Sequence, residues 1–258
     1  MAISGLFLDS PRRPAPAWVK GATMAGLLLL LSFLCWAVLI STARSWNVFW
    51  QYRLVFWRGW LLTLELACIS LVVSTFLGLV AALAKRSTII IIRYISTIYI
   101  EIIRGMPLLV LILVLWYVIF KDVTEGRLFF GILALSLFAG AYMAEIFRAG
   151  IESVGQSQRE SARAIGLTTW QTYRLIILPQ AARHSLPAFT GQLASLIKDS
   201  SLLSVLALTE FTYAAQQVYS ATYTTVETFL PLAAGYMILT IPISLWSKRL
   251  EKTLRYET

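Results

Sequence analysis

Long apolar runs with almost no charge constrain this chain more than any other feature. Residues 21–40 contain no charged side chain, and residues 61–84 contain one, Glu65. Further runs lie at 128–148, 186–208 and 229–246, and a longer apolar stretch covers 88–120. A helix needs about 20 mostly apolar residues to cross a bilayer. The chain is therefore predicted to be an all-α membrane protein with six spans.

The composition agrees with membrane embedding and excludes several other classes of protein. Of the 258 residues, 58% are hydrophobic and 14% are charged, whereas about a quarter of a soluble domain is charged. The net charge is +9, and the basic residues lie beside the apolar runs. The positive-inside rule explains this placement, so a nucleic-acid partner is not expected. Two cysteines and one histidine have no metal-ligand or disulfide-framework spacing. No GxxxxGK[ST] loop is present, so if ATP drives this protein, another chain must bind the ATP.

The N-terminal region leaves two alternatives open. Residues 1–20 are polar and are expected to form a cytoplasmic tail, and residues 21–41 are expected to form a transmembrane helix. Ser41 and Ala43 have the small-x-small pattern of a signal-peptidase site, so a cleaved signal peptide is the alternative. We favour a retained helix, because the apolar region of a signal peptide is usually shorter than this one.

The stretch from 88 to 120 is too long for one straight span. Arg104, Gly105, Met106 and Pro107 interrupt it. Proline lacks a backbone N–H and disfavours helical geometry in the residue before it. A break or kink is predicted at this point.

The distribution of Lys and Arg predicts the orientation. If the N-terminus is cytoplasmic and each span alternates, fifteen basic residues face the cytoplasm and five face outward, with Arg104 and Lys198 left out as intramembrane. The positive-inside rule favours this arrangement. Both termini and the hydrophilic segment 151–183 are therefore predicted to be cytoplasmic.

The cytoplasmic segment is predicted to contain two short helices. Ser157 with Glu160, and Thr168 with Gln171, match the capping-box pattern at a helix N-terminus. Gly166 is placed to end the first helix in a left-handed conformation, and Pro179 is expected to stop the second helix after Leu178. Helices this short are marginal in water, so they are expected to dock on another surface.

The same segment resembles the EAA motif of ABC importer permeases, E-A-A-x3-G-x9-I-x-L-P. The matching residues are Glu160, Ser161, Ala162, Gly166, Ile176, Leu178 and Pro179. Only Ser161 departs from the motif, because it replaces alanine with another small residue. Residues 99–109, 141–150 and 196–202 are similar to signatures of the polar amino acid subfamily (histidine, glutamine, glutamate and arginine type). The resemblance covers residues 60–250.

The resemblance implies a five-span type I ABC permease core, preceded here by one extra N-terminal transmembrane helix. It further implies an amino-acid importer in a bacterial inner membrane, with no cofactor in this chain. The implied partners are a cytoplasmic ATPase that docks on segment 151–183, a second permease chain (identical or homologous), an extracytoplasmic substrate-binding protein and membrane lipid. An ion-gradient-driven secondary transporter is the alternative, although no internal inverted repeat is visible. An intramembrane enzyme would need a catalytic motif such as HExxH or GxSxG, and neither occurs.

Ionisable residues at membrane depth are candidates for the substrate path. The candidates are Glu101, Arg104, Tyr142, Glu145, Lys198 and Asp199. The structural alternatives are a Glu145–Arg148 pair at the cytoplasmic end, a Glu101–Arg104 pair one turn apart, and a helix break or water-filled cavity at Lys198 and Asp199.

Two features are assigned to the outer surface. The aromatic stretch 46–60 is interpreted as an interfacial belt or a lateral helix. The outer loop 209–228 contains Glu210 and Glu227 and no basic residue, and these carboxylates are expected to help a substrate-binding protein to dock.

Overall fold

The structure is all-helical in the part of the chain that it describes. The computed structural model describes residues 17–42, 46–121 and 126–255. The long helices are α1 (Ala17–Thr42), α2 (Asn47–Ala84), α5 (Arg127–Ser153), α8 (Leu178–Asp199) and α10 (Val226–Arg255). The shorter α-helices are α3 (Ile90–Arg104), α4 (Leu108–Val114), α6 (Gln156–Ala164), α7 (Thr169–Thr172) and α9 (Phe211–Thr222). Two π-helical turns, η1 (Leu115–Ile119) and η2 (Tyr173–Ile177), and one 3₁₀ helix, η3 (Ser200–Leu206), join them.

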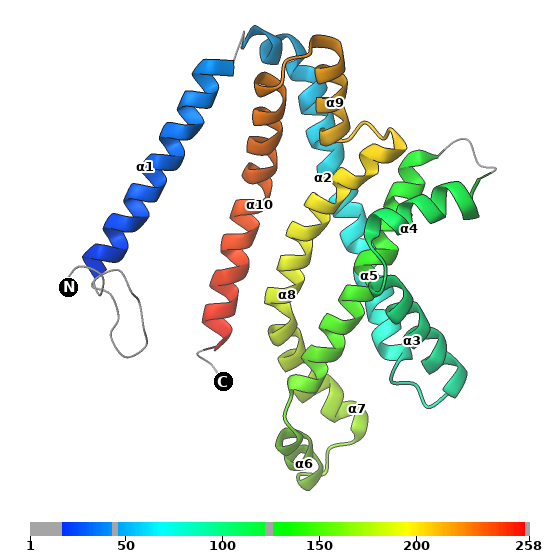
Figure 1. Ribbon diagram of the computed structural model, residues 1–258. Coiled ribbons are helices and arrows are strands. Elements are labelled where there is room, and N and C mark those ends of the chain that lie inside the picture. Colours follow the sequence, from blue (N-terminus) through cyan, green and yellow to red (C-terminus); the bar gives the residue numbers. More distant parts are fainter. Residues whose placement is uncertain (1–16, 43–45, 122–125, 256–258) are drawn as a thin grey trace, which may run out of the picture.

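Several of these helices can cross a membrane by length and composition. Within the described residues, α2, α5 and α10 do so as single helices, and α3 with α4 and η1 form a fourth, bent pair. α8 carries several polar residues and does not meet the same test, and in α1 only a shorter segment, Ala22–Leu34, is strongly apolar. The all-α membrane fold is confirmed, while the number of six spans remains a prediction. In Figure 1, α1 stands apart from the other helices, on the side of α10, whereas α10 packs with α8, α9 and α2. Of the predicted tail 1–20, residues 1–16 lie outside the described part, and α1 begins at Ala17.

The aromatic stretch is part of a spanning helix. Residues 47–60 form the first turns of α2, which continues without interruption to Ala84. A separate lateral helix was therefore a wrong expectation, because this sequence contains no Pro and its single Gly does not interrupt the helix. At 1.5 Å per residue, 38 residues reach about 57 Å, well beyond a hydrocarbon core of about 30 Å. The aromatic end thus lies where an interfacial belt is expected, with Trp50 and Trp57 more than half exposed.

The break before Pro107 is confirmed. α3 ends at Arg104, and α4 begins at Leu108 with Pro107 in an extended conformation at its N-cap. The two helices are bent by 110°. Because Pro107 cannot donate to the preceding turn, the chain changes direction where that hydrogen bond is missing.

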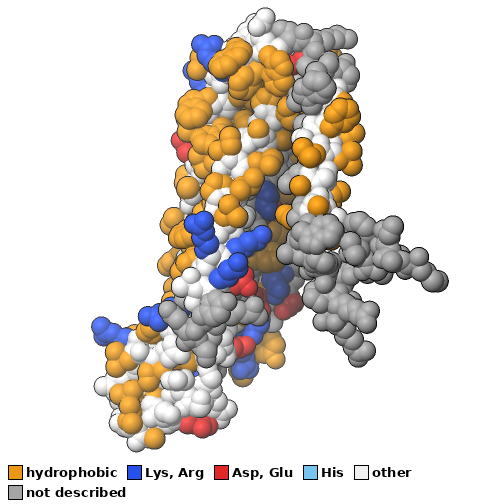
Figure 2. Space-filling view, turned by 90° about the vertical axis from the view of Figure 1, so that its left-hand side faces the viewer, with side chains coloured by type: hydrophobic (Ala, Val, Ile, Leu, Met, Phe, Trp, Pro, Cys, Tyr) orange, Lys and Arg blue, Asp and Glu red, His pale blue; other side chains and the backbone are white. Residues whose placement is uncertain are grey.

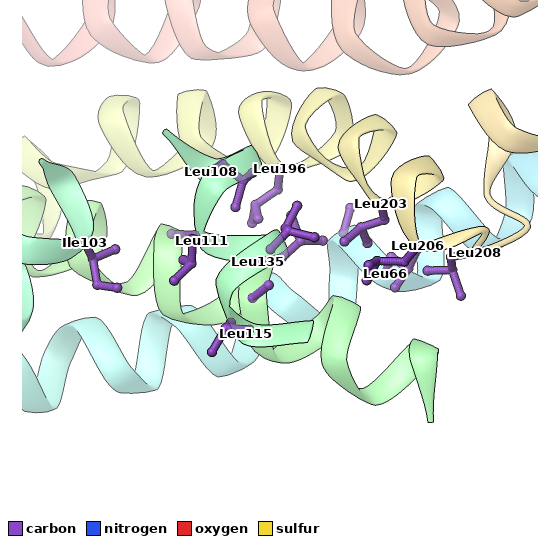
Figure 3. Close-up of a cluster of buried hydrophobic side chains, with 14 of the residues drawn as sticks. Leu66, Ile103, Leu108, Leu111, Leu115, Leu135, Leu196, Leu203, Leu206 and Leu208 are labelled. Carbon is purple, nitrogen blue, oxygen red and sulfur yellow. The ribbon is translucent and has the colours of Figure 1, made fainter. Parts of the chain in front are cut away.

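One apolar cluster holds the bent pair against the bundle. Leucines of α2, α4, α5, α8 and η3 converge on a single layer (Figure 3). Leu66, Leu135 and Leu203 are fully buried within it. In water, burial of a leucine side chain stabilises a fold by about 1.5–3 kcal/mol. At membrane depth, van der Waals contacts between closely packed side chains stabilise the helix bundle instead.

The long helices α2 and α5 approach each other closely at Gly78. A Cβ on Gly78 would lie 2.4 Å from Cβ of Met143 and 2.9 Å from the backbone N of Ala144. Any side chain at position 78 would therefore separate the helices. Small residues at such crossings are typical of membrane helix packing.

The fifth apolar run begins earlier than predicted and contains the expected break. α8 starts at Leu178, eight residues before the run at 186–208, and ends at Asp199, where the 3₁₀ helix η3 begins. Ala207 then adopts a left-handed conformation with φ of +53° and turns the chain toward α9. The break at Lys198 and Asp199 is confirmed.

Candidate functional site

The joint at Gly166 has the geometry that the sequence predicted. Gly166 has φ of +83°, in the left-handed region. Its N–H donates to the carbonyl of Arg163 at 3.0 Å, and the N–H of Leu167 donates to the carbonyl of Ala162 at 3.0 Å. These two bonds form a Schellman motif, which satisfies the last carbonyls of α6. The joint therefore sets the direction in which the chain leaves α6.

The start of α6 differs from the prediction. Its N-cap is Gly155, and no side chain caps the helix, so the Ser157–Glu160 capping box was wrong. Only Val154 and Gly155 separate α6 from α5, and Val154 is buried. The buried Val154 anchors this short connection, and α6 begins at Gln156, one residue before Ser157. Glu160 instead accepts a bond from Gln156 at 2.7 Å.

The second capping box is confirmed. The N–H of Gln171 donates to Oγ1 of Thr168 at 3.3 Å, and the N–H of Thr168 donates to Oε1 of Gln171 at 2.9 Å. The helix does not stop at Pro179, as was expected. It continues through the π turn η2 into α8, because the N–H of Leu178 reaches back to the carbonyl of Tyr173. Pro179 then lies just after the π turn, as the second residue of α8.

A small apolar cluster attaches this segment to the spanning helices. Ile151 and Val154 at the end of α5 pack with Ile177 and Ala181. Of the residues in the EAA-like motif, Ala162 is buried, Ile176 is half-buried and Leu178 is 43% exposed. Ile177 lies between Ile176 and Leu178 and is 1% exposed. It is the residue that packs against the end of α5. Glu160 and Ser161 are exposed on α6.

The segment α6–η2 also presents large apolar side chains to its surroundings. Ile165 is 74% exposed, Trp170 is 69% exposed and Leu175 is 61% exposed. The segment projects beyond the ends of α5 and α8 (Figure 1), and apolar side chains appear on the surface of this lobe (Figure 2). Below, the docking lobe denotes residues 156–177.

A cluster of charges gathers around Glu145 on α5. Oε1 of Glu145 lies 2.9 Å from Nζ of Lys85, and Oε2 lies 2.7 Å from a guanidinium nitrogen of Arg148. Arg104 contributes a third cation at 3.7 Å. The expected Glu145–Arg148 pair is confirmed, but it belongs to a larger cluster. Arg148 also pairs with Glu152, so three cations face two carboxylates and the cluster keeps an excess of positive charge.

Arg104 connects this cluster to an aromatic side chain. Its guanidinium carbon lies 5.5 Å from the ring centroid of Tyr142, within range of a cation–π contact. The alternative of a Glu101–Arg104 pair is wrong. Glu101 is exposed and makes no ion pair with any residue in the described ranges.

Lys198 and Asp199 lie at a different place. Both are at the end of α8, with Lys198 exposed and Asp199 half-buried. Among the residues that the structure describes, no hydrogen bond or ion pair joins either of them to the Glu145 cluster. The six path candidates therefore divide into a cluster of Arg104, Tyr142 and Glu145, an isolated Glu101, and the pair at the end of α8.

The outer acidic residues are buried, contrary to the expectation that they help a partner to dock. Glu210 is 0% exposed and Glu227 is 1% exposed. Glu210 caps α9 by accepting from the N–H groups of Thr212 and Tyr213, both at 2.8 Å, and from the hydroxyl of Tyr236 at 3.1 Å. Burial raises the pKa of the Glu210 carboxyl to about 7, although these hydrogen bonds act in the opposite direction. Glu210 thus has a structural position between α9 and α10.

Two participants were not identified as site residues from the sequence. Lys85 was seen only as the end of a span, and Glu210 only as part of an outer loop. No local pattern indicates the partner of Lys85, and glutamate is not among the residues that are preferred at an N-cap, so the position of Glu210 gave no clear signal either. In the part of the chain that the structure describes, no group of three or more His, Cys, Asp or Glu could hold a metal ion.

Comparison with known proteins identifies relatives of the same size and kind. Residues 74–256 match the family described as binding-protein-dependent transport system inner membrane component. The glutamine transport system permease protein of Escherichia coli is 29% identical over 82% of this chain and 98% of its own length. The nopaline transport system permease protein of Agrobacterium fabrum is 38% identical over 70% of this chain and 80% of its own length.

Solved structures agree with these relatives. A chain from the crystal structure of an amino acid ABC transporter with histidines is 32% identical, with a TM-score of 0.77 over 82% of this chain and 100% of that one. The MetNI methionine ABC transporter, at 19% identity and a TM-score of 0.64 over 78% of this chain and 96% of that one, shares the fold. These matches favour an ABC permease over an ion-gradient-driven secondary transporter. The chain therefore belongs to the inner membrane components of binding-protein-dependent transport systems, and it is the membrane-spanning permease subunit of an ABC importer.

Proposed function

We propose that this permease imports a polar amino acid or a close derivative, and that the docking lobe transmits ATP hydrolysis to the translocation path. The relatives named for glutamine, nopaline and L-cystine transport support the substrate class. The exposed apolar side chains of the docking lobe support its role. ATP and Mg bind to a separate ATPase subunit in this proposal.

The main evidence for the coupling role is the exposure of apolar side chains on the docking lobe. Ile165 and Trp170 lie on either side of the Gly166 joint and are each about 70% exposed. Exposed aromatic and aliphatic side chains on a projecting element mark a protein interface. The small residues Ser161 and Ala162 allow a partner to approach the backbone of α6. The ATPase subunit thus contacts Ile165 and Trp170, and the Gly166 joint transmits the movement to α8.

The Glu145 cluster is placed to link the lobe with the substrate path. Lys85 ends α2, Arg148 lies in the last turns of α5, and Arg104 lies at the break between α3 and α4. When the docking lobe moves and α5 moves with it, the distances between Glu145 and its three cationic partners change. Arg104 and Lys198 supply exposed cations for a substrate carboxylate, and Asp199 and Glu101 supply carboxylates for a substrate ammonium group.

The remaining parts of the assembly follow from the family. A second permease chain, identical or homologous, completes the path, and an extracytoplasmic binding protein delivers the substrate. The excess of basic residues in the predicted inner segments supports an orientation with both termini in the cytoplasm of a bacterium.

Removal of one exposed side chain tests the coupling role. Trp170→Ala in the full complex is expected to weaken binding of the ATPase subunit by about 30-fold, and hence to reduce its co-purification, since an aromatic hot-spot residue contributes about 2 kcal/mol or more to an interface. Trp246→Ala is the matched control, because Trp246 is 54% exposed on α10, away from the lobe. Unchanged ATPase retention in Trp170→Ala, or equal loss in Trp246→Ala, would contradict the proposal.

Transport by reconstituted vesicles tests the substrate class. Uptake of the polar amino acids is measured in the presence of the binding protein and ATP. Arg104→Gln is expected to lower uptake while the ATPase subunit remains bound, because Arg104 lies outside the lobe. Uptake that is driven by an ion gradient without ATP would overturn the proposal.

A further inference from the structure

A polar recess of about 490 Å³ lies between α6 and the cytoplasmic ends of the spanning helices. Its walls come from α6, from the end of α5 and from the turn between α2 and α3. The charged and amide side chains that line it are Arg86, Glu152, Gln156, Arg159, Glu160 and Arg163. The four that belong to α6 stand at the first, fourth, fifth and eighth positions of this helix, which is the pattern of a single helix face, so one face of α6 points into the recess.

The recess contains more hydrogen-bond donors than acceptors. Its two carboxylates already have partners, because Glu152 pairs with Arg148 and Glu160 accepts from Gln156. Each guanidinium offers five N–H groups. The number of N–H groups that are free to bind a ligand therefore depends on the contacts of Arg86, Arg159 and Arg163.

The arginines leave most of these donors unused. Arg159 donates from Nη2 to the carbonyl of Ile151 at 2.9 Å, but its buried Nε has no partner among the described residues. To the described part of the chain, Arg86 makes one bond, from its guanidinium to the hydroxyl of Tyr173 at 3.1 Å. The exposed side chain of Arg163 makes no hydrogen bond or ion pair with the described part of the chain. A buried donor without a partner is costly, so the recess favours an anionic ligand.

The position of the recess indicates where this anion comes from. Arg86 follows the end of α2 by two residues, on the membrane side of α6. Beginning three residues after Arg86, Ile89, Ile90 and Ile91 are between 56% and 71% exposed, as expected for side chains in contact with lipid. An apolar groove of about 420 Å³ between α2 and α3 reaches Ala84, two residues before Arg86. Figure 2 shows further Lys and Arg side chains over the lower half of the molecule, above the docking lobe.

We propose that the recess binds the phosphate of an anionic phospholipid from the cytoplasmic leaflet. Arg86, Arg159 and Arg163 donate to the phosphate oxygens, and an acyl chain lies in the groove between α2 and α3. Guanidinium groups match phosphate geometry, and basic pockets at the cytoplasmic surface suit anionic headgroups. This lipid connects the inner leaflet to α6 and goes beyond the coupling role, because its binding does not require the ATPase subunit.

Native mass spectrometry of the full-length permease, with and without its ATPase subunit, tests the proposal by titration with phosphatidylglycerol. Arg163→Gln is expected to lower the ratio of lipid-bound to lipid-free protein about fivefold, the effect of one basic side chain near an anionic surface. Arg159→Lys is expected to lower the ratio as well, since lysine keeps the charge but lacks the Nε donor. Arg174→Gln is the matched control, because Arg174 is exposed in the same segment but does not line the recess.

The outcomes separate the sources of the anion. Unchanged binding in Arg163→Gln, or an equal loss in Arg174→Gln, would overturn the proposal. Free phosphate that displaces the lipid at millimolar concentration and binds without it would show a phosphate site and refute a lipid site. Displacement of the lipid by the ATPase subunit would assign the recess to an acidic side chain of that partner. Lipid loss with normal ATPase retention in Arg163→Gln would support the lipid site independently of the coupling role.

Discussion

Nζ of Lys85 lies 2.9 Å from Oε1 of Glu145, and this ion pair joins the end of α2 to α5 across sixty residues of sequence. The same carboxylate accepts two bonds from Arg148, one turn further along α5. Glu145 is thus the common acceptor of cations from different helices. Its side chain is only 17% exposed, so the cluster is sensitive to the loss of its single central charge.

Replacement of Glu145 by glutamine is expected to destabilise the permease by about 1–2 kcal/mol. Lys85 and Arg148 would keep their positive charges without the carboxylate, and hydrogen bonds to charged groups contribute about 1.5–3 kcal/mol when well shielded from water. Thermal unfolding of the purified complex measures the change. Glu152→Gln is the control, because it removes an exposed carboxylate from the same Arg148. An equal effect of both substitutions would show that Glu145 has no special role.

Gly166→Val is expected to leave membrane insertion intact but to uncouple ATP hydrolysis from uptake. No atom lies within 4 Å of the place that a Cβ at this position would take, so the change acts on the backbone alone, through φ of +83°. A left-handed residue with a side chain costs about 1–2 kcal/mol. The left-handed conformation at position 166 would therefore be populated roughly 5- to 30-fold less. The ratio of uptake to ATP hydrolysis in vesicles measures the effect.

Two further variants make this prediction specific. Gly166→Asn should retain most of the coupling, because asparagine adopts left-handed geometry more readily than valine. Gly155→Ala should behave like the unchanged protein, because Gly155 has φ of −56° and an added Cβ would meet only Ser157 Oγ, at 3.6 Å. Coupled transport by Gly166→Val would show that the joint does not transmit the movement.

The buried carboxyl of Glu210 is expected to make stability depend on pH. Its pKa rises from an ordinary value of 4.5 to about 7 in the folded state. The folded protein therefore holds a proton that the unfolded chain releases between these values, and the stabilisation is lost as the pH rises through 7. The difference amounts to roughly 3 kcal/mol. Unfolding temperatures of the complex between pH 5 and pH 8.5 should fall with rising pH.

Glu210→Gln provides the control for this pH dependence. Glutamine retains one acceptor for the N–H groups of Thr212 and Tyr213 but does not titrate. The variant is expected to have a lower unfolding temperature at pH 5 and a flatter profile above it. A profile that is identical in slope to that of the unchanged protein would assign the pH dependence to another group.

Gly78→Val is expected to disrupt the crossing of α2 and α5. The added atoms would overlap with Met143 and the backbone of Ala144, and overpacking of this kind costs about 3 kcal/mol. The yield of folded permease in the membrane fraction and its unfolding temperature are the measurements. Gly191→Ala serves as the control, because no atom lies within 4 Å of a Cβ at Gly191. A folded Gly78→Val variant of normal stability would contradict the close packing.

Sequence reasoning succeeded where a feature depends on a few neighbouring residues. Pro107 breaks the helix because its own backbone lacks an N–H. Gly166 and the Thr168–Gln171 box form as predicted because each closes hydrogen bonds within six residues. It failed at Ser157, because α6 begins at Gln156, after a connection of only two residues in which Val154 is buried. It also failed at Pro179, because the π turn before it widens the helix and lets α8 continue.

The contacts around Glu145 and Glu210 lay beyond sequence reasoning. Glu101 is as close to Arg104 in sequence as Arg148 is to Glu145, yet only the second pair forms. Which face of α3 turns toward α5 depends on how these two helices pack, and the spacing of Glu101 and Arg104 does not specify this. Likewise, nothing local shows that Glu210 is covered by α10 and is therefore unavailable to a partner.

The amino-acid order alone specified the membrane class, the helix break at Pro107 and the left-handed joint at Gly166. Apolar runs, prolines and glycines act through the backbone and solvent at their own position, so their effects can be read without a partner. The tertiary structure decided that Lys85 meets Glu145, that Glu210 is buried and that Arg86, Arg159 and Arg163 share one recess. These contacts join side chains from separate helices, and their distances depend on how α2, α5 and α10 pack against one another.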